Sequence, residues 1–129
     1  MTQEQLKAIP EVQALLDQAL QARLQGRLDE AATLDDRALA QALARKDRKG
    51  ETEALRGRGN VHQFAGQMQK ALGLYRQAID VARAIGDTSG EARALSNAGI
   101  AYKDTGQSRR ALEVQNQALS LYQKVGNVR

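Results

Sequence analysis

The sequence has no cysteine and no tryptophan, a single proline and a single phenylalanine in 129 residues. Without cysteine the chain cannot form disulfides or thiolate metal sites. Only one histidine is present, so we expect no metal site and no cofactor. Aromatic residues make up only 3% of the chain, too few for the stacking platforms that bind single-stranded nucleic acid. Nucleic acid is therefore a disfavoured partner.

Long apolar runs are also missing. No stretch reaches the roughly 18 consecutive apolar residues that would cross a membrane. Residues 1–13 lack the basic start and apolar run of a secretory signal. We expect a cytoplasmic protein with no membrane contact.

The residues that are abundant favour helix. Alanine and leucine dominate the apolar set, and such residues have high helix propensity. The net charge of +4 is uneven, since residues 1–53 hold 8 basic and 10 acidic residues and residues 54–129 hold 11 and 5. This asymmetry fits either an acidic partner or a solvated surface of mixed charge. One basic run, Arg45–Lys49, falls in an expected loop.

The chain repeats itself with a period of 40 residues, the most informative pattern that it contains. The shift aligns glycines, alanines and leucines in three copies: Gly26, Gly66 and Gly106; Ala31, Ala71 and Ala111; Ala38, Ala78 and Ala118; Leu15, Leu55 and Leu95. Within each copy the apolar spacing predicts two helices, A and B. The expected ranges are 10–25 and 28–46, 51–65 and 68–85, and 89–105 and 108–125.

We therefore predict an all-α solenoid of three helical hairpins, with repeats at about 10–49, 50–89 and 90–129 after a lead-in at 1–9. Gly26, Gly66 and Gly106 are expected to close the A helices in a left-handed conformation. Ser89 and Ser108 are expected to cap the helices that follow them. Gly99 lies inside an A helix, which indicates that another backbone passes close to it.

The third copy resembles the tetratricopeptide repeat in Leu95, Ala98-Gly99, Tyr102, Ala111 and Ala118, and the second copy has the same pattern. The period resembles that of the longer variant of this family. A HEAT-type solenoid has a similar period but does not account for Gly99 and Tyr102 three residues apart. The resemblance implies a right-handed superhelix whose concave side is built from A helices. It also implies a non-enzymatic scaffold that binds a peptide or a partner helix.

Carried onto this sequence, the resemblance implies a polar groove on the second and third A helices. Its residues would be Glu53, Arg56, Asn60, Gln63, Arg93, Asn97 and Lys103. Three of them, Arg56, Asn60 and Asn97, resemble part of the carboxylate clamp of chaperone-binding members. The alternative is that they are solvated groove residues or form local hydrogen bonds between helices.

Catalysis has no support in the sequence. Adjacent helical residues such as Asp35 and Asp36 point about 100° apart, so they do not form an acid–base pair. They are expected on the surface or in a structural role. His62 occupies the position of Tyr102 and is expected to pack. No nucleophile–base set is visible, so we predict no enzyme and no catalytic residue.

The last B helix carries an apolar face with no following helix to cover it. Its residues are Leu112, Leu119, Tyr122 and Val125. Such a face favours association, so a homodimer or higher oligomer through this helix is one expectation. The other is that the sequence is part of a longer array, such as a sensory or oligomerisation module of a bacterial regulator.

Overall fold

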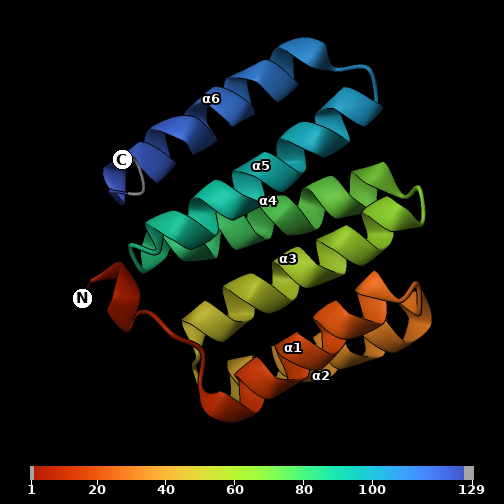
Figure 1. Cartoon of the computed structure of the whole chain (residues 1–129), viewed down its shortest axis with the longest axis vertical. Coiled ribbons are helices and arrows are strands. Elements are labelled where there is room, and N and C mark those ends of the chain that lie inside the picture. Colours follow the sequence, from red (N-terminus) through yellow and green to blue (C-terminus); the bar gives the residue numbers. More distant parts are fainter. Residues whose placement is uncertain (1, 127–129) are drawn as a thin grey trace.

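The computed structural model describes residues 2–126, which form six α-helices after one short 3-10 turn (Figure 1). The end of the expected third repeat, residues 127–129, lies outside this range. The elements are η1 (Gln3–Gln5), α1 (Pro10–Leu24), α2 (Leu28–Ala44), α3 (Arg48–Phe64), α4 (Met68–Ala84), α5 (Thr88–Asp104) and α6 (Ser108–Lys124). The all-α class and the six expected helices are confirmed, and most boundaries agree within one or two residues.

The largest boundary error is at the start of α3, which begins at Arg48, three residues before the expected start at residue 51. Asp47 precedes α3, and its side chain accepts a hydrogen bond of 2.9 Å from the backbone N–H of Gly50. Asp87 does the same before α5, accepting from Gly90 at 3.0 Å. The prediction that Ser89 caps this helix is wrong, because the N-cap is Asp87, two residues earlier, whose carboxylate accepts from the free N–H of Gly90.

The predicted cap at Ser108 is also wrong. Ser108 is the first residue of α6, and Gln107 before it makes no side-chain capping bond. The glycine turns, by contrast, are as predicted: Gly26, Gly66 and Gly106 have φ of +76°, +78° and +78°. A residue without Cβ adopts this conformation at little cost, so each A helix ends cleanly.

The helices pair in sequence order and form two layers. Each hairpin packs A against B, and α2 and α4 also contact the next A helix. The A helices α1, α3 and α5 contact one another in succession. In Figure 1 α1 lies in front of α2, and α5 in front of α4. One face of the array is therefore built from A helices, and the groove described below lies there.

The core is rich in alanine, so helices approach closely. Tyr75 is the largest fully buried side chain, at 0% exposure. A Cβ at Gly59 would lie 2.5 Å from the Tyr75 ring, so only glycine leaves room for that ring. The expectation at Gly99 is corrected: its close neighbour is the side chain of Gln115 on α6, not a backbone.

Candidate functional site

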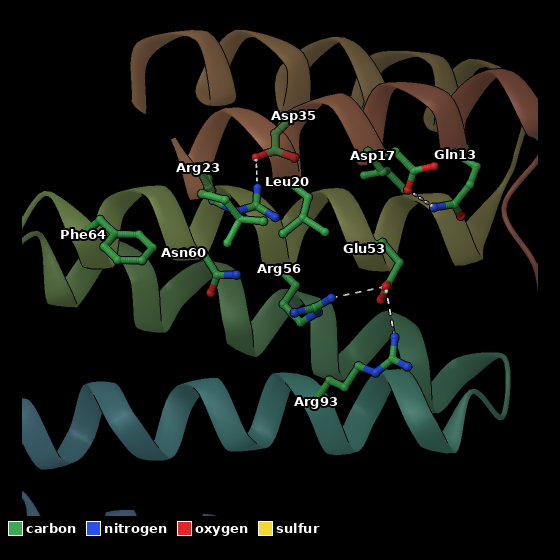
Figure 2. Close-up of a pocket in the computed structure, with 12 residues that line it drawn as sticks. Gln13, Asp17, Leu20, Arg23, Asp35, Glu53, Arg56, Asn60, Phe64 and Arg93 are labelled. Carbon is green, nitrogen blue, oxygen red and sulfur yellow. Dashed lines mark hydrogen bonds and ion pairs between the residues drawn. The ribbon is translucent and has the colours of Figure 1, made fainter. Parts of the chain in front are cut away.

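Two adjoining hollows, which we call the inner groove, lie along the A helices. The first has a volume of about 360 Å³. Its walls are Gln13, Leu16, Asp17, Leu20, Arg23, Leu24, Asp35, Glu53, Arg56, Asn60, Phe64 and Arg93. The second, of about 470 Å³, is lined by Asn60, Gln63, Phe64, Asn97, Ile100 and Asp104. Both hollows share Asn60 and Phe64, so together they cross α1, α3 and α5 (Figure 2).

Glu53 is the centre of the charged part of the groove. Its carboxylate lies 3.3 Å from Arg56, 3.5 Å from Arg93 and 3.8 Å from Lys49. Figure 2 shows Arg56 and Arg93 reaching this carboxylate from α3 and α5. Arg56 also donates to the Oδ1 of Asn97 at 3.4 Å. A carboxylate from outside would have to compete with Glu53 for these arginines.

The second polar group lies behind the groove wall. The Tyr75 hydroxyl is 2.6 Å from the side-chain oxygens of both Asn60 and Gln63, so it can donate to one of them at a time. Burial raises the pKa of Tyr75 far above its ordinary value, so the phenol stays protonated and remains a donor. Asn60 can therefore accept a hydrogen bond from the core through its oxygen, in alternation with Gln63.

A buried ion pair forms the end of the groove nearest the first repeat. Asp35 on α2 is 0% exposed, and the Nη1 of Arg23 donates to its Oδ2 at 2.9 Å. Burial raises the pKa of Asp35 to about 6, because desolvation outweighs the attraction of Arg23. The expectation of a structural Asp35 fits this burial. The neighbouring Asp36 is exposed and pairs with Arg58 at 2.6 Å.

Exposed apolar side chains lie toward the C-terminal ends of the A helices. Leu24 and Phe64 are 71% and 70% exposed, and Leu20 and Ile100 are 44% and 47% exposed. Figure 2 shows Leu20 and Phe64 extending into the same space as Asn60. The exposed apolar side chains of the inner groove are therefore gathered toward the C-terminal ends of the A helices, where they lie beside the polar walls formed by Arg23, Asn60 and Asp104.

The structure brings six of the seven predicted groove residues to these walls. Lys103 is exposed on α5 and lines neither hollow. Sequence reasoning missed Phe64 and the inward role of Asp35. Both had a signal, since Phe64 lies forty positions after Leu24, and Asp35 lies forty positions before the buried Tyr75. A charged residue at a core position requires a partner, here Arg23.

The outer face of α6 has unusual exposure. Leu112 and Leu119 are 64% and 56% exposed, whereas Leu72 and Ile79, forty residues earlier on α4, are 3% and 8% exposed. Tyr122 and Val125 are half-buried, and Tyr122 packs on the core. The uncovered apolar face is thus centred on the two leucines.

The described residues contain no group of three or more histidine, cysteine, aspartate or glutamate side chains that could hold a metal ion. Among the helices described, none has the length and apolar character needed to cross a bilayer.

Comparison with known proteins identifies the fold. A family model described as tetratricopeptide repeat matches residues 11–84 and again residues 50–124. The structure is similar to the TPR domain of Arabidopsis FLU, with a TM-score of 0.80, 20% identity, and coverage of 88% of this chain and 96% of that one.

The structure is also similar to the N-terminal domain of stress-induced protein-1 (STI-1) from C. elegans. The TM-score is 0.66 at 20% identity, over 90% of this chain and 92% of that one. Comparison with curated proteins gives no match.

Proposed function

Because this chain belongs to the tetratricopeptide repeat family, whose domains are typically non-catalytic protein-interaction modules, we propose that it binds a segment of a partner protein in the inner groove. The observation that carries this proposal is the exposure of Phe64, Leu24, Leu20 and Ile100 beside a charged cluster on the same walls. Large apolar side chains gathered in a concave surface favour binding of a complementary apolar surface.

The chemistry of the groove walls favours an amphipathic ligand segment. One edge of the ligand would cover Phe64 and Ile100, and the other would lie over Glu53, Arg56 and Arg93. The charged side chains of the first hollow balance, with three aspartate or glutamate residues and three arginines on its walls. An amphipathic helix laid across α1, α3 and α5 fits this pattern better than a strongly acidic tail.

The polar walls have unused hydrogen-bonding capacity. Asp35 Oδ1, Glu53 Oε2 and Arg56 Nε are buried and make no hydrogen bond among the described residues, and all three belong to walls of the first hollow. Buried polar atoms are normally satisfied, so a shift of these side chains that lets water or a ligand group reach them would complete the missing bonds. The ligand should therefore present polar groups toward α3 as well as apolar ones.

The test is selection of binding peptides from a displayed library on the immobilised chain, followed by fluorescence anisotropy with each selected peptide. Phe64→Asp should weaken binding by at least about tenfold, because it places a charge in the apolar contact. Leu43→Asp is the matched control, since Leu43 is 54% exposed on α2, outside the groove. Equal loss with both variants, or none with Phe64→Asp, would contradict groove binding.

A second surface, the outer face of α6, supports self-association. The two ends of the array differ, because the exposed outer residues of α1 are Ala14, Gln18 and Gln21, whereas α6 exposes Leu112 and Leu119. In a head-to-tail contact, Leu112 and Leu119 of one copy would pack on the polar glutamines of α1 in the next copy, which is an unfavourable match. We therefore propose a two-fold pairing of α6 with α6, in which Leu112 of one copy faces Leu119 of the other.

Light scattering coupled to gel filtration over a range of concentrations tests this pairing. The wild type should become a dimer as concentration rises, and the double change Leu112→Asp and Leu119→Asp should hold it as a monomer. Tyr122→Asp is a poorer probe, since Tyr122 also packs on the core. A wild-type monomer at the highest concentration, or a dimer that survives the double change, would refute the pairing.

A further inference from the structure

A second pocket, away from the inner groove, lies where the N-terminal segment crosses the loops between repeats. It has a volume of about 400 Å³. Its floor is apolar and half-buried, formed by Leu6, Ile9 and Ile85. Its rim is basic: Lys7, Arg45, Lys46, Arg48 and Lys49. We call it the basic pocket.

The N-terminal segment is held in place by the side chain of Gln3. Its Nε2 donates to the Gly86 carbonyl at 2.7 Å, and its Oε1 accepts from the Ser89 N–H at 3.1 Å. The Ile9 N–H donates to Asp47 at 2.9 Å. These bonds tie both ends of the segment to the loops, and so bring Lys7 over the basic pocket.

Not all of the rim is neutralised inside the protein. Arg45 pairs with Glu11 at 3.1 Å, Arg48 with Glu51 at 3.0 Å, and Lys49 with Asp87 at 2.8 Å. The one acidic wall residue, Asp47, is buried and already accepts bonds from Ile9 and Gly50. Among the side chains that the structure describes, no ion pair engages Lys7 or Lys46, and both are exposed.

Lys46 stands out because of its backbone. A left-handed turn follows every helix from α1 to α6, at positions spaced by twenty residues. Five of the six positions are glycine, with φ between +70° and +78°, and the sixth is Lys46 at +56°. At the five glycines the space around a Cβ is open, so glycine is favoured there by backbone conformation alone. Lysine is disfavoured relative to glycine in this conformation.

From these observations we propose that the basic pocket is a second binding site, which takes an acidic amphipathic segment of a partner protein. Carboxylates of the segment would pair with Lys46 and Lys7, and its apolar side chains would cover the floor. Charge complementarity favours an acidic ligand, and the apolar floor favours a peptide over a nucleic-acid backbone, which offers phosphates without apolar side chains. Binding of the ligand by the ammonium group would explain why a lysine occupies this left-handed position in place of glycine.

Substitution of Lys46 should have opposite effects on the stability of the fold and on peptide binding. The probe is a short fluorescein-labelled peptide that alternates glutamate with leucine, titrated with the full chain at low salt. Lys46→Gly should raise the urea midpoint of unfolding, because it removes the left-handed lysine, and yet weaken peptide binding by about fivefold. Lys46→Gln keeps the backbone cost and should weaken binding equally.

Matched variants locate the effect. Lys7→Gln should weaken binding to a similar degree, whereas Lys70→Gln, an exposed lysine near the opposite ends of the hairpins, should leave it unchanged. Phe64→Asp should also leave it unchanged, which separates this site from the inner groove. Failure of the groove test would therefore not affect this result.

Three outcomes would overturn the proposal. The first is an absence of binding, or equal binding of a lysine–leucine peptide. The second is tighter binding of a single-stranded oligonucleotide of similar length. The third is binding that Lys46→Gly and Lys46→Gln leave intact.

Discussion

Asp35 in the first repeat and Tyr75 in the second occupy the same place in the pattern, forty residues apart, and both side chains are fully buried. Each is bonded by the residue twelve positions before it. Arg23 donates to Asp35 at 2.9 Å, and the Tyr75 hydroxyl donates to Gln63 at 2.6 Å. The same link between an A helix and its B helix is thus an ion pair in one repeat and a neutral hydrogen bond in the next.

Tyr75 and Asp35 contribute different properties to their repeats: Tyr75 adds apolar burial, and Asp35 adds an ionisable group. Tyr75 fills its space with a ring packed on Gly59, so the second repeat gains apolar burial. Asp35 adds little apolar burial and has one buried oxygen without a hydrogen bond among the described residues, but it supplies an ionisable group at a wall of the inner groove. The repeat geometry therefore accepts either solution at this position. The second repeat should be the rigid centre of the array, and the first should respond to pH.

The largest effect is expected for Tyr75→Ala, which tests whether the second repeat is the rigid centre of the array. Removing a fully buried ring should lower the free energy of unfolding by about 3–5 kcal/mol, because it leaves a cavity between α3, α4 and α5. Urea denaturation followed by circular dichroism measures the loss. A loss below about 1 kcal/mol would show that the second repeat is not the rigid centre.

Removing the counterion in the first repeat should have the next largest effect. Arg23→Ala leaves Asp35 buried without its partner, and we expect a loss of about 2–3 kcal/mol near neutral pH. The loss is smaller than for a permanently charged group, since Asp35 can take up a proton. Arg27→Ala is the control, because Arg27 and Glu30 form an exposed pair on the surface. Equal losses in the two variants would contradict a special role for Arg23.

The pH dependence sharpens the contrast further. Asp35 has a pKa of about 6 in the folded state and an ordinary value of 3.8, so the folded chain binds this proton more tightly. Lowering the pH from about 7 to about 5 should therefore raise the free energy of unfolding by about 1 kcal/mol through this group. The gain is lost again as pH rises through the folded-state pKa. Asp35→Asn should remove it, so the measurement is the difference between the two chains; identical pH profiles would count against it.

The smallest expected effect extends the comparison to the third repeat. Gly99 is the counterpart of Gly59, but its close neighbour is the exposed, flexible side chain of Gln115 in place of a buried ring. Gly99→Ala should stabilise the protein by up to about 1 kcal/mol, because alanine favours helix and the exposed Gln115 can move aside with the loss of only its 3.3 Å hydrogen bond to the Ser96 carbonyl. Gly59→Ala should destabilise it. Thermal unfolding of both variants tests this, and a shift of the same sign in both would contradict it.

The sequence predicted the helices because its signals are local. The period of 40 and the glycine at each turn define the hairpins, and the resemblance to the tetratricopeptide repeat named Glu53, Arg56 and Asn97, which line the inner groove in the structure. The bond from Arg56 to Asn97 could not be predicted, since it joins two helices and depends on their separation. The match between Arg56 and Glu53, three residues apart on one helix, was visible in the sequence but was not used.

Two further errors have a common physical cause. The caps were assigned to serines by residue type, whereas Asp47 and Asp87 act because each lies three positions before a glycine whose N–H it accepts. Likewise Lys46 was read only as part of a basic run, although its place in the series of turn glycines marked it as unusual. In both cases position within the repeat was more informative than residue type.

The side chain of Gln3 has one more consequence, for the cooperativity of folding. Helix contacts in the array join elements that are neighbours or next neighbours in the chain, whereas Gln3 bonds to residues 83 and 86 positions away. A linear array of repeats can fray from either end, since each unit depends only on the next. The two hydrogen bonds of Gln3 join the N-terminal segment to the junction between α4 and α5. The N-terminal segment and the first hairpin can therefore open together only after these bonds break. Local opening at the N-terminal segment is thereby coupled to the junction between the second and third repeats.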